Sequence, residues 1–127
     1  VLFDKTSVAK EESIKIIDDI ILDNNTGIAD FDICRVFINL LDNSINALKN
    51  YTGDDKLLYL SCKQDNDHIF IKCENKFSET IRKPEKKPEL HGYGMKIVKD
   101  ITEKYNGELI TQIQDTTFST LAILKTE

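Results

Sequence analysis

The stretch FINLLDNSINALKN, residues 37–50, decides how the rest of the chain is interpreted. Its apolar residues recur with the spacing of an α-helix and continue a pattern that begins a few residues earlier. The resulting broad apolar arc consists of Ile33, Val36, Phe37, Leu40, Leu41 and Leu48. This pattern predicts a helix over residues 31–49 with one face in the core, and Asp30 or Asp32 as its N-terminal cap.

Four asparagines form a stripe on the opposite side of this predicted helix. Asn39, Asn43, Asn46 and Asn50 are spaced i, i+4, i+7 and i+11. Each Asn costs roughly 0.6 kcal/mol relative to Ala inside a helix, so the four cost about 2 kcal/mol. Their amide oxygens are hard, uncharged ligands that suit Mg²⁺. The stripe therefore indicates either a metal site or a polar face that is merely rich in Asn.

The flanking segments predict the fold. Strands are expected at residues 13–21, 56–64, 68–75, 108–114 and 118–125. A second helix is expected from Met95 to Tyr105, ended by Asn106-Gly107. The predicted fold class is α/β (α+β): a two-layer sandwich whose mixed, largely antiparallel sheet is covered on one face by helices.

A second stretch, HGYGMKIVKDI at residues 91–101, follows a segment without apolar periodicity. Residues 76–90 contain both prolines and are expected to form a long loop of the kind that acts as a lid. Gly92 and Gly94 then stand before the second predicted helix. They suit either an ordinary helix entry or a cradle in which backbone amides approach phosphate.

Bulk properties narrow the class of protein. The chain of 127 residues fits one domain, and its net charge of −5 argues against a general nucleic-acid binder. No apolar run is long enough for a membrane span, and no signal-peptide pattern is present. Cys34, Cys62 and Cys73 form no metal-binding pair and are expected to be free thiols. The opening Val1 suggests a piece of a longer protein.

The order NLLDNSINA, two strands, a loop and HGYGMKIV resembles the ATP-binding domain of the GHKL superfamily, whose fold is called the Bergerat fold. Gyrases, the heat-shock chaperone, sensor histidine kinases and the mismatch-repair protein share this domain. The nearest likeness is to AgrC-type quorum-sensing histidine kinases, which share the short lid, the HGxG box and endings like EKYNGEL. The resemblance covers Ser7 to Ile123. It implies that residues 1–12 are the tail of a dimerisation helix and that residues 13–127 are the catalytic domain, with a lid at about 76–91.

The resemblance also implies a binding site for ATP and Mg²⁺. Asn39 and Asn43 match the asparagine box that helps to hold the metal. The residues expected at the nucleotide are Asn39, Asn43, Asn46, Asn75, His91, Gly92, Tyr93, Gly94, Met95 and Lys96. No catalytic side chain is expected within the chain itself.

Three departures from the family pattern bear on the mechanism. Asn39 occupies the place of the glutamate that activates water in hydrolysing members, which favours the kinase branch. Asn75 occupies the place of the aspartate that reads adenine, and as a neutral acceptor it implies modest affinity. The alternative for Asn75 is a turn residue at a strand end. Asn46 stands where many kinases carry a lysine that reaches phosphate.

The resemblance implies the catalytic domain of a two-component sensor histidine kinase, which transfers the γ-phosphate of ATP to a histidine on a separate dimerisation domain. The expected partners are that domain and a response regulator, with no nucleic acid and no membrane contact by this domain. The isolated domain is expected to be a monomer in the cytoplasm, as part of a membrane-anchored bacterial kinase. The alternatives are a degenerate interaction module that binds no nucleotide and a serine kinase of the anti-sigma-factor type.

Overall fold

A computed structural model describes residues 14–22, 26–65, 67–77 and 89–126, with the backbone alone for residues 89–93. The elements that it contains, in chain order, are β1 (Lys15–Ile20), α2 (Asp30–Lys49), β2 (Leu57–Asp65), β3 (His68–Lys76), α3 (Glu89–Lys104), β4 (Glu108–Gln114) and β5 (Thr117–Lys125). Residues 1–12, which the sequence assigns to a dimerisation helix, lie outside the described residues, as does most of the expected lid.

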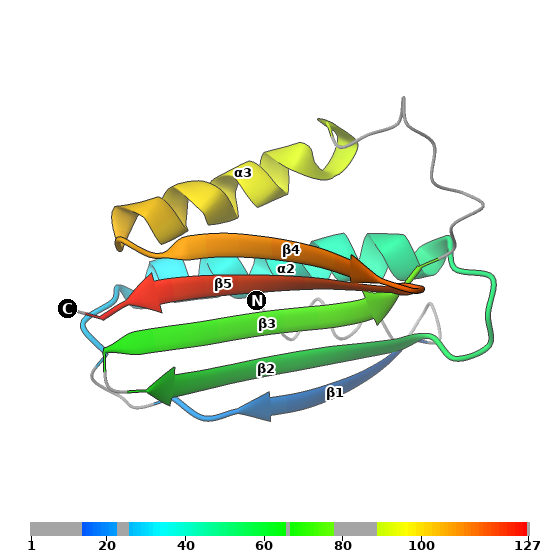
Figure 1. The fold of residues 1–127 in the computed structure, drawn as a ribbon, viewed down its shortest axis with the longest axis horizontal. Coiled ribbons are helices and arrows are strands. Elements are labelled where there is room, and N and C mark those ends of the chain that lie inside the picture. Colours follow the sequence, from blue (N-terminus) through cyan, green and yellow to red (C-terminus); the bar gives the residue numbers. More distant parts are fainter. Residues whose placement is uncertain (1–13, 23–25, 66, 78–88, 127) are drawn as a thin grey trace.

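The strands form one five-stranded sheet in the order β1-β2-β3-β5-β4. β1 and β2 are parallel, whereas the other neighbouring pairs are antiparallel. Both helices pack on the same face of the sheet, with α2 against β3 and α3 against β4 and β5 (Figure 1). The predicted two-layer sandwich with a mixed, largely antiparallel sheet is therefore confirmed.

The core lies between the helices and the sheet. The whole apolar arc of α2 is buried, as its helical spacing predicts. On the sheet side, alternate residues of each strand face the helices because side chains alternate along a strand. In β3 the buried residues are Ile69, Ile71, Cys73 and Asn75. The polar Asn75 is thus the exception on an otherwise apolar face.

The three cysteines are free thiols, as predicted. Cys34 is exposed, whereas Cys62 and Cys73 are buried. Burial raises the pKa of Cys62 to about 11 and that of Cys73 to about 12, so both remain protonated at neutral pH. The thiol of Cys73 and the hydroxyl of Ser44 form a hydrogen bond of 3.1 Å, which links β3 to α2.

The second helix begins earlier than its sequence predicts. The expected start at Met95 is wrong, because α3 begins at Glu89 and contains both Gly92 and Gly94. The predicted end is confirmed: Asn106 has a φ of 56°, and the Gly107 N–H donates to the Thr102 carbonyl at 2.7 Å. These contacts make a Schellman motif, the usual C-terminal cap of a helix. None of the helices in the described part of the chain is long and apolar enough to cross a membrane.

Candidate functional site

Three elements converge at the end of the molecule where β3 ends. The C-terminal half of α2 and the N-terminal part of α3 both lie at this end, because the two helices run antiparallel (Figure 1). The asparagine stripe lies on α2, Asn75 lies on β3, and the glycine stretch lies on α3. The structure therefore brings the elements that carry the predicted site residues together at this end of the fold, with Asn39 at the middle of α2.

Asn39 is in close contact with Gly94. Asn39 is half-buried, and its side-chain Nδ2 donates to the Arg35 carbonyl at 2.7 Å. A Cβ atom added at Gly94 would lie 2.9 Å from Asn39 Oδ1. Because real Cβ contacts essentially never come this close, only glycine fits there without displacing the amide. The two helices are thus close enough at this point for the backbone of α3 at Gly94 to lie against the side chain of Asn39 on α2.

The stripe divides into two pairs by exposure. Asn39 and Asn43 are half-buried, whereas Asn46 and Asn50 are exposed. Asn50 is the C-terminal cap residue of α2, and its Nδ2 donates to the Asn46 carbonyl at 3.5 Å. Asn39 and Asn43, one turn apart, are therefore the pair best placed to face a ligand between the helices.

Asn75 carries a buried acceptor that has no partner. The residue is only 2% exposed, and its Nδ2 donates to the Lys76 carbonyl at 2.9 Å. Its Oδ1 is the one buried side-chain nitrogen or oxygen without a hydrogen-bond partner in the described part of the chain. An unsatisfied buried polar atom costs about 1–3 kcal/mol. A hydrogen-bond donor from outside the protein would remove this cost at Asn75 Oδ1.

The alternative interpretation of Asn75 as a turn residue is wrong. Asn75 lies within β3 and pairs with Leu58 on β2 and with Phe118 on β5. Its side chain points to the helix-covered face, two residues beyond Cys73, which contacts α2. Asn75 is thus a sheet residue facing the helix layer near the end of its strand.

The remaining predicted residues belong to α3. Met95 packs against the core, whereas Lys96 is exposed and its Nζ lies 3.1 Å from Asp100 Oδ2. For His91, Gly92 and Tyr93 the structure describes the backbone alone. The nucleotide contacts assigned to these residues by resemblance stay predictions.

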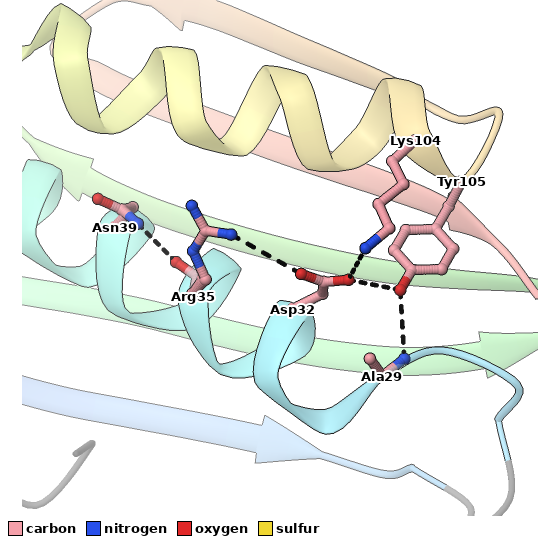
Figure 2. A network of polar contacts seen from close by, with 6 residues as sticks. All are labelled: Ala29, Asp32, Arg35, Asn39, Lys104 and Tyr105. Carbon is pink, nitrogen blue, oxygen red and sulfur yellow. Dashed lines mark hydrogen bonds and ion pairs between the residues drawn. The ribbon is translucent and has the colours of Figure 1, made fainter.

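At the opposite end of the two helices, Asp32, Lys104 and Tyr105 form a polar cluster that we call the α2–α3 clamp. Asp32 Oδ2 accepts from Lys104 Nζ at 2.8 Å and from the Tyr105 hydroxyl at 2.5 Å (Figure 2). The guanidinium of Arg35 lies 3.8 Å from the other carboxylate oxygen. The Tyr105 hydroxyl in turn accepts from the Ala29 N–H at 3.3 Å. The clamp ties the first turn of α2 to the last turn of α3.

The clamp overturns the predicted cap of α2. The N-cap residue is Ala29, which makes no side-chain cap, and Asp30 and Asp32 lie inside the first turn. Asp32 bonds instead to residues more than 70 positions away in the sequence, at Lys104 and Tyr105. No local pattern reveals such a contact, so the clamp could not be predicted from sequence.

The clamp predicts an acid-sensitive contribution to stability. The hydrogen bond from Lys104 holds the pKa of Asp32 below its usual range, with the Tyr105 hydroxyl and the charge of Arg35 adding to it. A lowered folded-state pKa gives stability that is present above the unfolded value of about 3.9 and is lost as pH falls through the folded value. We expect the free energy of unfolding, measured with urea, to fall more steeply below about pH 4 in the wild type than in Asp32→Asn. Parallel acid limbs would contradict this assignment.

A shallow hollow of about 450 Å³ lies on the other face of the sheet. It is lined by Lys72, Glu74 and Lys76 of β3 together with residues of β4, β5 and their turn. Because side chains alternate along β3, these residues point away from Asn75 and from both helices. The hollow is therefore separate from the convergence of α2, α3 and Asn75.

A protein-family model described as GHKL domain matches residues 28–124. The chain belongs to the GHKL domain family. GHKL domains bind ATP, generally with Mg²⁺, and the matched range of this GHKL domain contains the whole of α2, β3 and α3. No curated protein matches the chain.

Solved structures share the fold of this GHKL domain at low sequence identity. A nucleotide-free form of the catalytic domain of histidine kinase ThkA superposes with a TM-score of 0.72 at 15% identity, covering 95% of this chain and 85% of that one. The Acinetobacter baumannii histidine kinase AdeS superposes with a TM-score of 0.71 at 14% identity, covering 99% of this chain and 63% of that one. The fold is thus similar to that of histidine kinase catalytic domains.

Proposed function

We propose that this chain is the ATP-binding catalytic domain of a two-component sensor histidine kinase of the AgrC type. It would transfer the γ-phosphate of ATP to a histidine on a separate dimerisation domain. The observation that carries this proposal is the orphaned Oδ1 of Asn75, buried on the helix-covered face of a GHKL domain. The close approach of Gly94 to Asn39 supports it, since a Cβ would fill that space.

Asn75 suits the adenine ring because it presents an acceptor only. Its Nδ2 is held by the Lys76 carbonyl, which leaves Oδ1 to accept a hydrogen bond. The exocyclic amino group of adenine is a donor of the matching kind. A neutral amide accepts more weakly than a carboxylate, so the affinity is expected to be modest.

Asn39 and Asn43 would hold Mg²⁺ through their amide oxygens. When bound, Mg²⁺ would neutralise the charge of the nucleotide phosphates. The described residues contain no group of three or more His, Cys, Asp and Glu side chains that could bind a metal. A site of few amide ligands suits Mg²⁺, because phosphates and water complete its shell.

Transfer to a protein side chain fits this site better than hydrolysis. Asn39 stands where hydrolysing relatives carry a glutamate, and an amide cannot take a proton from water. The Asn39 amide is also fixed to its own helix through the Arg35 carbonyl. Asn39 therefore serves to hold and orient, and not to activate water.

The proposed partners, cellular location and remaining nucleotide contacts follow from the same proposal. The partners would be the dimerisation domain of the parent kinase and a response regulator, in the cytoplasm beneath a membrane-anchored sensor used in quorum sensing. His91, Gly92, Tyr93, Gly94, Met95 and Lys96 of α3, together with Asn46, complete the proposed nucleotide contacts. The residues 78–88 that would supply the lid lie outside the described structure.

One observation favours the degenerate interaction module as a second candidate. Lys96 is paired with Asp100, and the Asn39 amide with Arg35, so both polar groups have partners within the protein itself. In that case α2 and α3 would serve only as a surface for another protein. A direct binding measurement separates the two candidates.

We expect calorimetry to detect binding of a non-hydrolysable ATP analogue that strengthens when Mg²⁺ is present. Asn75→Leu should weaken this binding at least tenfold, because the adenine amino group would meet an apolar side chain. The same change should leave the melting temperature close to that of the wild type, since removal of an unsatisfied buried oxygen offsets the loss of the hydrogen bond from Asn75 Nδ2 to the Lys76 carbonyl.

The matched control is Thr120→Val, which makes a similar exchange at a buried residue on the same face of the sheet, opposite Cys73. This variant should bind the analogue as the wild type does. No heat from the wild type at millimolar nucleotide would reject the kinase assignment in favour of the interaction module. Normal binding by Asn75→Leu would reject the role of Asn75.

A further inference from the structure

We propose that the α2–α3 clamp, formed by Asp32, Lys104 and Tyr105, is a positioning device that sets the conformation of the Asn39 amide from the far end of the helix pair. The proposal rests on the proposed function, because Asn39 matters there as a ligand of the metal–nucleotide complex. Asp32 precedes Asn39 by seven residues, which places both on one face of α2 about 10 Å apart along the axis.

The clamp first fixes the beginning of α2. This helix has no side-chain cap of its own, and the Ala29 N–H donates instead to the hydroxyl of Tyr105, the residue that follows the end of α3. The same hydroxyl donates to Asp32 in the first turn. Without Tyr105 the first turn of α2 would lose both bonds, and unanchored helix ends fray.

A continuous series of contacts then leads from the first turn to Asn39. The carboxylate of Asp32 pairs with the Arg35 guanidinium at 3.8 Å, and the Arg35 carbonyl accepts from Asn39 Nδ2 at 2.7 Å. Figure 2 shows these residues along one side of α2, with Lys104 and Tyr105 reaching them from α3. A change in the first turn is therefore one helical turn from the carbonyl that holds the amide.

The clamp also determines how α3 lies against α2. Lys104 follows Gly94 by ten residues, so α3 extends about 15 Å from its clamped end to the contact with Asn39. A tilt of a few degrees at the clamp would move Gly94 by about 1 Å. A shift of this size would change the contact with Asn39, because a carbon added at Gly94 would lie only 2.9 Å from Asn39 Oδ1.

These two routes give the clamp a role beyond general stability. Among the described side chains of α3, Lys96 also pairs with Asp100 and Lys99 with Glu103, but both pairs are exposed and lie within the helix. Such i,i+4 pairs contribute only about 0.3–0.5 kcal/mol and do not connect the helices. The clamp connects them, and its Asp32 is almost fully buried.

The test is the side-chain amide resonance of Asn39 in ¹⁵N-labelled protein, assigned by its absence in Asn39→Ala. Tyr105→Phe keeps the ring and removes only the hydroxyl, and Asp32→Asn removes the charge. Both should shift the Asn39 resonance while those of the exposed Asn46 and Asn50 stay in place. Both should also weaken binding of the Mg²⁺–ATP analogue about three- to tenfold. Lys99→Gln, which breaks an exposed pair on α3, should change neither readout.

Two results would overturn the inference: an unshifted Asn39 resonance in the folded variants, or a shift that affects all side-chain amides of α2 equally. If Asp32→Asn fails to fold, Tyr105→Phe decides alone. A wild type that binds no nucleotide contradicts the proposed function, while the Asn39 resonance still decides whether the clamp positions this amide. The two ideas therefore fail separately.

Discussion

Replacing Gly94 by alanine is expected to remove most of the binding of Mg²⁺–ATP while leaving the stability of the fold nearly unchanged. The added Cβ would lie 2.9 Å from Asn39 Oδ1, and the only group that must move is the end of that side chain. The displaced amide loses its hydrogen bond to the Arg35 carbonyl. We expect the affinity for a non-hydrolysable ATP analogue to fall on the order of a hundredfold, about 2.7 kcal/mol.

The stability of Gly94→Ala follows from two opposing effects of similar size. Gly94 is the sixth residue of α3, and alanine in a helix interior is favoured over glycine by about 1 kcal/mol. Loss of the Asn39 hydrogen bond costs about 1 kcal/mol. The free energy of unfolding should therefore stay within about 1 kcal/mol of the wild type.

The affinity for the nucleotide is measured by calorimetry, and the free energy of unfolding is measured with urea on the same sample. Gly94→Ala together with Asn39→Ala provides the control, because the double variant removes the clash and, with alanine at both helix positions, should be at least as stable as Gly94→Ala alone. Unchanged nucleotide binding in the single variant would show that the contact between Gly94 and Asn39 plays no part in the site.

The apolar pattern of α2 could be predicted because it is a local property of the sequence. Every residue of its arc is buried, since helical spacing alone decides which side chains share a face. The strands and the end of α3 at Asn106-Gly107 were predictable for the same reason. Each depends on residues within a few positions of one another.

The beginning of α3 could not be predicted in this way. Gly92 and Gly94 are poor helix formers, and a preceding segment with two prolines favours a helix that starts after them. The structure places both glycines inside the helix, where Gly94 packs against Asn39, about 55 positions earlier in the chain. Tertiary packing outweighs the local preference there.

The candidate site could be predicted only in outline. The resemblance chose Asn39, Asn43 and Asn75, and the structure brings their elements together at one end of the fold. The orphaned oxygen of Asn75 depends on the strands at either side of β3 and on its bond to Lys76. The clamp joins residues separated by more than 70 positions, and no motif in the sequence indicates it.

Replacing Gly107 by alanine is expected to destabilise the fold severely, although the chemical change is the same as at Gly94. An added Cβ would lie 1.8 Å from the Ile123 carbonyl oxygen and 2.7 Å from its carbonyl carbon. Both atoms belong to the backbone of β5, which is paired on both sides in the sheet. No side chain can move aside to relieve this overlap.

The strain at Gly107 would spread to the end of α3. The Gly107 N–H closes the Schellman motif on the Thr102 carbonyl, and Glu108, the next residue, pairs with Ile123. Separating Gly107 from β5 therefore breaks either the helix cap or the start of the β4–β5 ladder. Overpacking of this kind typically costs about 1–3 kcal/mol and occasionally more, and backbone contact puts Gly107→Ala at the upper end.

A loss of about 3 kcal/mol corresponds to a melting temperature lowered by roughly 10 °C, measured by circular dichroism. Gly94→Ala is the matched control, since it adds the same carbon at a glycine inside α3 and should melt near the wild type. The clamp lies between Gly107 and the rest of α3, with Lys104 and Tyr105 at its last turn, so Gly107→Ala should also shift the Asn39 amide resonance in any protein that stays folded. A variant that melts like the wild type would mean that β5 can move away from Gly107. The idea that this contact holds the end of α3 rigidly against the sheet would then be wrong.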